Sequence, residues 1–125
     1  MSKTILLRQE IMKIFQSLNC SVYFEKAPKG SSFPYLVYSF DTVNYIYDSR
    51  DDVFMLIDVW DRRESTTEVE RLTDQVESLL GYLNHPDSTI LATFYKESRM
   101  SVEDEDDLIK HRQLRVKIEN YYIGG

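Results

Sequence analysis

Hydrophobic residues recur at helical spacing in the first segment of the chain. Between Lys3 and Leu18 the apolar side chains fall on one face, and charged or amide side chains separate them. This pattern predicts an amphipathic helix with one buried stripe. Asn19 ends the periodicity, and the alternation from Ser21 to Phe24 is typical of a short strand.

Two longer alternating segments lie in the middle of the chain. The stretch YLVYSFDTV begins at Tyr35 and VFMLIDVWD begins at Val53, and both are dense in the aromatic and β-branched residues that favour strands. The polar stretch NYIYDSRDD between them predicts a turn. We therefore expect the two strands to form an antiparallel hairpin at the centre of a sheet.

A second helix is expected after this hairpin. The stretches STTE, from Ser65, and TEVE, from Thr67, both fit the capping box that satisfies the first amides of a helix. Hydrophobic residues from Val69 to Leu83 then lie on one helical face. The alternation at Thr89–Tyr95 and Leu108–Tyr122 predicts further strands, the last with Leu114, Val116 and Ile118 facing inward.

The order of these elements predicts the fold class. Hairpin connections, with no regular strand–helix–strand alternation, favour an α+β fold in which an antiparallel sheet of about four to five strands packs against two helices. With 42% hydrophobic residues the chain has enough apolar material for one core. We expect a single domain over residues 1–125.

Two aspartates bracket the single tryptophan at the end of the second long strand, in the order Asp58, Val59, Trp60, Asp61. Paired carboxylates can serve as general acid and base. Asp58 and Asp61 point to opposite faces of a regular strand, however, so they cannot converge on one substrate. We interpret them as structural residues. The residues expected to face the helices are Val53, Met55, Ile57 and Val59.

Charge and cysteine content argue against several classes of protein. The net charge of -6 argues against a specific nucleic-acid binder, because phosphate contacts need Lys and Arg. The chain has no apolar run long enough for a membrane span or a signal peptide, so we expect it to be made and kept in the cytoplasm. Cys20 has no disulfide partner, and His85 and His111 lack a zinc-ligand spacing. We therefore expect no metal or other cofactor.

The densest charge is a run of five carboxylates inside a polar stretch that begins at Ser98: Glu103, Asp104, Glu105, Asp106 and Asp107. Such a run could hold a divalent cation, but a calcium loop needs alternating ligands and a glycine at its sharp turn. No glycine is present, and we interpret the run as a solvated loop. Basic residues follow between Lys110 and Lys117. This segregation suits either a contact between subunits or a hairpin with opposite charges at its base.

Three large side chains, Tyr45, Ile46 and Tyr47, lie in the expected turn between the two long strands. Tyrosine at such a place is a frequent interface anchor. Two interpretations stay open: the tip forms an interface, or it folds over its own sheet. The sequence offers no visible pair for nucleophilic chemistry, so no catalytic residue is assigned. The residues alone indicate an interaction protein.

Five features occur in a characteristic order: the N-terminal amphipathic helix, the stretch FPYLVY from Phe33, the stretch LIDVWD from Leu56, an acidic-capped helix containing Glu70, Leu72, Asp74 and Val76, and a final strand. This order resembles the tail completion proteins of long-tailed, non-contractile bacteriophages, the family of tail terminator and tail-to-head joining proteins. The resemblance spans nearly the whole chain. Its motifs are strand and helix patterns rather than chemical signatures.

The resemblance implies a structural protein of the virion tail and no enzyme. It implies a ring, commonly a hexamer, at the head-proximal end of the tail tube, where the partners are the tail tube protein and the head-completion (connector) protein. The loop from Ser98 to Asp107 would then line the lumen or face a partner, since carboxylates repel DNA. Two alternatives stay open: a host cytoplasmic adaptor, and an enzyme or small-ligand-binding regulator whose site is assembled from distant residues.

Overall fold

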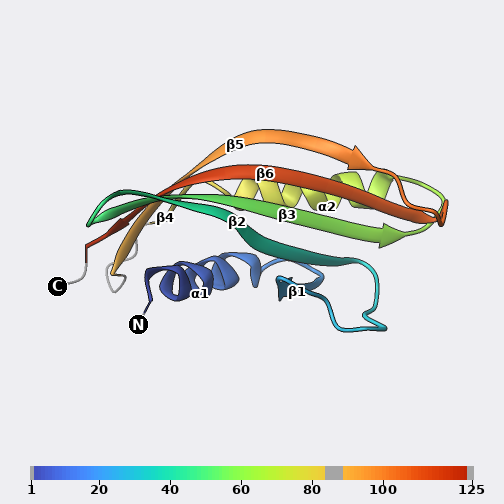
Figure 1. The fold of residues 1–125 in the computed structure, drawn as a ribbon. Helices are drawn as coiled ribbons and strands as arrows, with labels where there is room; N and C mark the ends of the chain where they lie inside the picture. The colour runs from blue at the N-terminus through green and yellow to red at the C-terminus, as the bar shows by residue number, and fades with distance from the viewer. Residues whose placement is uncertain (1, 84–88, 124–125) are drawn as a thin grey trace.

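The computed structural model describes residues 2–83 and 89–123, which form two helices and one six-stranded sheet (Figure 1). In chain order the elements are α1 (Lys3–Phe15), β1 (Ser21–Phe24), β2 (Tyr35–Tyr47), β3 (Arg50–Arg62), α2 (Thr67–Leu79), β4 (Tyr82–Leu83), β5 (Ile90–Val102) and β6 (Ile109–Tyr122).

The sheet has the strand order β1-β2-β3-β6-β5-β4. Strand β1 is parallel to β2, and the other neighbouring strands of the described chain are antiparallel. The predicted α+β class, with two helices on a mainly antiparallel sheet, is confirmed. Two short edge strands, β1 and β4, bring the number of strands to six.

Both helices cover the same face of the sheet. Helix α1 lies against β2, where the Phe15 ring meets the Tyr38 ring edge-on at a centroid distance of 5.6 Å. Helix α2 contacts β3 and β6. The core between the helices and the sheet includes the fully buried side chains of Leu7, Ile11, Phe15, Tyr38, Val69, Val76, Val116 and Ile118.

Strand β3 shows the expected alternation of side chains. Val53, Met55, Ile57 and Val59 are fully buried under the helices, and Asp61 is buried on the same side, where it forms an ion pair with Arg63. Asp58 and Trp60 lie half-buried on the opposite, uncovered face. The two aspartates therefore do not form a carboxylate pair, as the strand periodicity required.

The long strands extend further than the sequence predicted. Strand β2 continues through Tyr47 and β3 begins at Arg50, so the turn is shorter than the predicted stretch NYIYDSRDD. Strand β5 continues through Val102, so the residues from Ser98 to Val102 belong to a strand rather than to the acidic loop. Both extensions pair with long neighbouring strands, and such pairing overrides local propensity.

The second helix also differs from its prediction at both ends. Thr66 is the N-cap residue but makes no side-chain capping bond, and Ser65 Oγ accepts a hydrogen bond from the Thr67 amide at 3.1 Å. The capping boxes are therefore not formed. The helix ends at Leu79, and the chain then enters the short strand β4. His85 lies outside the described residues. In the described ranges, neither helix is long and apolar enough to cross a membrane.

Replacing Tyr38 with Phe tests the contact between α1 and the sheet. The Tyr38 hydroxyl donates a hydrogen bond to the Arg8 carbonyl at 2.9 Å, and burial raises the pKa of Tyr38 to about 12. Loss of this bond should lower the free energy of unfolding by about 1 kcal/mol in urea denaturation. The matched change at the exposed Tyr95, Tyr95→Phe, should have no measurable effect. Equal values for both variants would contradict this role of the hydroxyl.

Candidate functional site

The acidic loop, residues Glu103 to Asp107, joins β5 to β6 at one end of the sheet. Asp104 Oδ1 accepts a hydrogen bond from the Asp106 amide at 2.9 Å, and Asp106 Oδ1 accepts one from the Leu108 amide at 2.9 Å. Such side-chain turns shape the connection. Arg62, at the end of β3, donates to Asp106 Oδ2 at 3.2 Å, which ties the loop to the sheet.

Exposure divides the five carboxylates into two groups. Asp106 is half-buried, and the hydrogen bond from the Leu108 amide, together with the Arg62 guanidinium, lowers the pKa of its carboxyl. The loop presents its other carboxylates to solvent: Glu103, Asp104, Glu105 and Asp107. Asp106 is thus the structural centre of the loop, while the remaining charges face any approaching partner.

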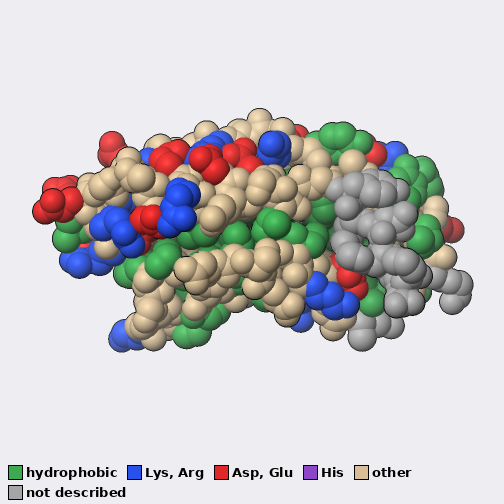
Figure 2. All heavy atoms as spheres, turned by 180° about the vertical axis from the view of Figure 1, so that it is seen from behind, with side chains coloured by type: hydrophobic (Ala, Val, Ile, Leu, Met, Phe, Trp, Pro, Cys, Tyr) green, Lys and Arg blue, Asp and Glu red, His purple; other side chains and the backbone are tan. Residues whose placement is uncertain are grey.

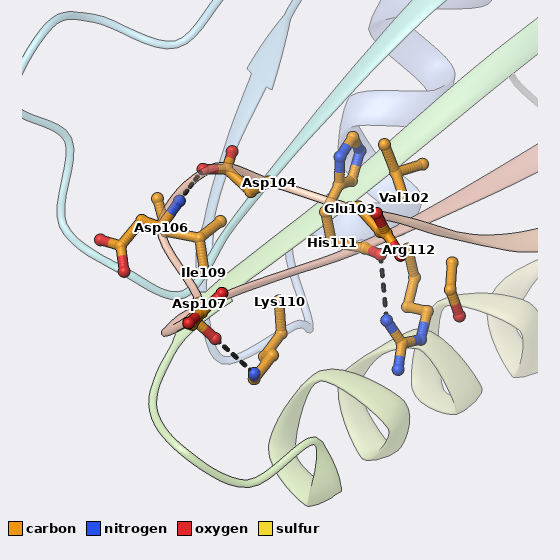
Figure 3. Close-up of a pocket in the computed structure, with 10 residues that line it drawn as sticks. Val102, Glu103, Asp104, Asp106, Asp107, Ile109, Lys110, His111 and Arg112 are labelled. Atoms are coloured by element: carbon orange, nitrogen blue, oxygen red, sulfur yellow. Dashed lines mark hydrogen bonds between the residues drawn. The ribbon is translucent and has the colours of Figure 1, made fainter.

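A groove of about 370 Å³ lies beside this loop, between the ends of β5 and β6 (Figure 3). The Lys110 side chain lines part of it, and its Nζ donates a hydrogen bond to the Asp107 carbonyl at 2.5 Å. The groove is wide open to solvent. Within the described residues, no group of three or more His, Cys, Asp or Glu side chains is arranged to hold a metal ion. The absence of a metal site stays a prediction.

The tip side chains Tyr45, Ile46 and Tyr47 lie at the end of β2. Their exposed fractions are 82%, 46% and 52%, so they remain largely in solvent rather than covering their own sheet. Tyr47 contacts Tyr121 of β6 at a ring-centroid distance of 6.5 Å, and the Arg50 guanidinium lies 5.6 Å from the Tyr121 ring. The predicted interface role of the tip is compatible with this exposure and stays a prediction.

The tip and the acidic loop lie at opposite ends of the molecule. Strand β3 runs from Arg50 beside the tip to Arg62 beside the loop, a length of about 40 Å for thirteen extended residues. Figure 1 shows the long strands running from one end of the molecule to the other. Acidic side chains protrude at the loop end, and hydrophobic side chains reach the surface at the other end (Figure 2).

The uncovered face of the sheet carries a contact that sequence reasoning missed. His111 on β6 lies opposite Trp60 on β3, and their rings stack at a centroid distance of 4.2 Å. The His111 Nε2 lies 2.7 Å from Asp58 Oδ1, which also accepts a hydrogen bond from Gln113 Nε2 at 3.0 Å. Tyr35 extends the ring cluster at 5.2 Å from Trp60. The cluster joins three adjacent strands.

The basic residues of β6 pair with acidic side chains of their own subunit. Arg115 donates to Glu97 at 3.1 Å and to Asp41 at 3.3 Å. Lys117 lies 3.7 Å from an Asp52 carboxylate oxygen. Part of the basic charge of β6 is therefore paired within the subunit, and a role of the segregated charge in a contact between subunits stays a prediction.

A second charged network fastens α2 to β5 and β6. Arg99 bonds to Asp74 at 2.7 Å and to Glu77 at 2.5 Å, and it also contacts Glu70. Arg112 bonds to the same Glu70 carboxylate. The hydrogen bond from Arg112 is the main cause that lowers the pKa of Glu70, and Arg99 adds to it. Helix position here depends on charge pairs as well as on apolar burial.

These arrangements favour assembly over chemistry. The polar side chains of the uncovered face pair with one another, and they lie on an open sheet. Burial raises the pKa of the Cys20 thiol, which makes it a poor nucleophile. The fold and its surfaces thus define a small assembly protein, an α+β domain with one uncovered sheet face and exposed apolar side chains at one end.

Comparison with known proteins identifies the family. The chain belongs to the family of tail completion protein gp17, whose family model matches residues 7–119. Comparison with curated proteins finds no match. The protein is therefore a structural component that completes a phage tail and is located in the virion tail, in agreement with the predicted function. The family is a structural one.

Two solved structures share the fold. A chain of the virion of a native gene transfer agent particle superposes with a TM-score of 0.63 at 11% sequence identity, over 96% of this chain and 92% of that chain. The gp17 protein of bacteriophage SPP1 superposes with a TM-score of 0.55 at 16% identity, over 94% of this chain and 89% of that chain. The common architecture covers nearly the whole chain.

The Glu70 network should make stability depend on pH. The pKa of Glu70 is lower in the folded protein than in the unfolded chain, so its stabilising effect is present above the unfolded value of about 4.3 and lost as pH falls through the folded value. Glu70→Gln should lower the free energy of unfolding at pH 7 by about 1 kcal/mol, a small effect because solvent screens this exposed carboxylate.

Urea denaturation from pH 7 to pH 3 measures this dependence. The difference between wild type and Glu70→Gln should shrink as pH falls below about 4. Glu64→Gln is the matched control, since Glu64 is exposed and lies just before the helix. A difference that stays constant over the whole range would show that the Glu70 carboxylate charge is not what stabilises the helix.

Proposed function

We propose that this protein forms a ring of six copies at the head-proximal end of the tail tube and joins the tube to the head. Membership of the tail completion family supports this role. The observation that carries the proposal is the separation of two unlike exposed surfaces, the aromatic tip and the acidic loop, at opposite ends of strands about 40 Å long.

Each end of the molecule has a distinct place in this proposal. The exposed aromatic tip is suited to protein contact, because tyrosine buries a large area at small entropic cost. The acidic loop is assigned to the lumen or to the head-side partner. Its solvent-facing carboxylates and the net charge of -6 would repel passing DNA and keep it from binding the ring. The partners are then the tail tube protein and the connector protein, and the protein catalyses no reaction.

Electron microscopy of particles made without this protein tests the proposed role. If the ring joins tail to head, a phage lacking the gene should give free heads beside unjoined tails. Supplying the wild-type protein from a plasmid should restore joined particles. Normal joined and infectious virions in its absence would overturn the proposal.

The tip can be tested separately from the fold. Tyr45→Ala combined with Tyr47→Ala removes two exposed rings, so the circular dichroism spectrum and the urea midpoint should stay close to wild type. The same variant should fail to add to purified tail tubes in a sedimentation assay, because the anchor side chains are gone. Tyr23→Ala, which removes a half-buried ring on β1 outside the tip, is the control. Undiminished addition of the tip variant would exclude the tip from the contact.

A further inference from the structure

Two stretches of edge strand have no strand beside them among the described residues. Strand β1 pairs with Tyr35–Tyr38 of β2, which leaves Phe40–Tyr47 uncovered. Strand β4 pairs with Ala92 and Thr93 of β5, and the Phe94 amide bonds to Gly81, which leaves Tyr95–Val102 uncovered. Unpaired N–H and C=O groups along such edges are templates for another strand.

Exposed apolar side chains gather on these two edges. The described chain has eight large hydrophobic side chains that are exposed, and five of them lie on the uncovered stretches. They are Tyr45, Ile46 and Tyr47 on β2 and Tyr95 and Met100 on β5. Proteins commonly protect an edge with proline, very short strands, charged side chains or bulges. Neither stretch contains a proline, although both have bulges and the β5 stretch has charged side chains. The exposed apolar side chains make the two edges candidates for contact surfaces.

We propose that the subunits of the ring join edge to edge, with the uncovered stretch of β2 in one copy pairing with the uncovered stretch of β5 in the next copy. The inference rests on the proposed ring and specifies its contact. Strand β2 is antiparallel to β3, β3 to β6 and β6 to β5, so β2 and β5 run in opposite directions. If neighbouring copies have the same orientation, β2 of one copy and β5 of the next therefore run antiparallel to each other. Two different edges meet, which makes the contact heterologous and able to close a ring.

Side chains that lie opposite each other across the joint must point to the same face of the sheet, and this restricts the possible registers of β2 and β5. If Thr42 lies opposite Met100 of the next copy, Val43 lies opposite Arg99 on the helix-covered side. Tyr47 then lies opposite Tyr95 on the uncovered side. Within one copy, Tyr47 is aligned through Arg50 with Tyr121, and Tyr95 pairs with Lys117, so Tyr47 and Tyr95 both lie on the uncovered face. A shift of the joint by one residue would place side chains of opposite faces across from each other, so only registers that match the faces are allowed.

The positions of the edges also set the inclination of the strands. Phe40 is level with Lys96 across the sheet. Because β2 has a bulge between Phe40 and Thr42, Phe40 lies opposite Ser101 of the neighbour in the joint, and both side chains are on the helix-covered side. Neighbouring copies are therefore offset by about four to five residues, or about 13–17 Å. Each copy advances four strand spacings, about 19 Å, and the resulting tilt of about 35–40° lies within the inclination found in closed barrels.

Crosslinking in assembled particles tests the edge joint. In a Cys20→Ser background, which removes the single cysteine, Asn44→Cys on β2 and Ser98→Cys on β5 are combined in one chain. A bismaleimide that spans about 10 Å, roughly three strand residues, tolerates a small error in register. Particles with joined heads should give a ladder of crosslinked subunits in denaturing gels, from dimer up to the full ring.

Two controls and a second pair of positions complete the design. Asn44→Cys alone should give no dimer, because like edges do not meet. Ser32→Cys with Ser98→Cys places the first thiol in the exposed connector before β2 and should give no ladder. If the first pair prevents joining of heads, Thr42→Cys with Met100→Cys replaces it, since these two positions lie opposite each other in the proposed register. Joined particles without a ladder, or dimers from Asn44→Cys alone, would overturn the edge joint.

The outcomes separate this inference from the proposed function. Particles that need the protein for joining but show no ladder leave the joining role standing and reject the edge contact. Particles that join without the protein reject the proposed function itself. A ladder in joined particles that depend on the protein supports both.

Discussion

The antiparallel pairing of β3 with β6 is the constraint on which the rest of this structure depends. It aligns Val53, Met55 and Ile57 of β3 with Ile118, Val116 and Leu114 of β6, so that a continuous apolar surface faces the two helices. The same register places Asp58 and Trp60 beside Gln113 and His111 on the other face. A slip of one residue would turn every one of these side chains to the wrong side. The hydrophobic layer and the polar face are thus two results of one register.

The length of these strands determines where function can lie. Thirteen paired residues separate the tip from the acidic loop, and the core under the helices holds the middle of the sheet. The ends extend past that core. There, charge pairs contribute to the contacts: Arg99 and Arg112 hold Glu70 of α2, and Arg62 holds Asp106 of the loop. The result is a stable centre that presents unlike ends to other proteins.

Strand periodicity made much of the fold predictable, and the missing parts have a common physical reason. The alternation in β3 and β6 identified the inward-facing residues, because that alternation is the same whatever strand pairs alongside. The sequence predicts loops at the ends of β2 and β5, since Asn44, Ser98 and Ser101 have weak strand propensity and their pairing comes from distant segments. The contact of His111 with Asp58, 53 residues away, needed the register itself. The acidic run and the exposed tip were visible in the sequence, but their places at opposite ends were not.

Uncovered apolar edges and a strong negative charge act against each other in this protein. An edge with Tyr45, Ile46 and Tyr47 in solvent invites pairing with any strand that meets it. The net charge of -6 repels other copies in solution, and the bulges in β2 and β5 interrupt the flat edge that indiscriminate pairing needs. A single short strand contact is small compared with a stable protein interface. Pairing of the edge strands should therefore be most favourable where another surface already holds the copies side by side. The end of a tail tube is such a surface.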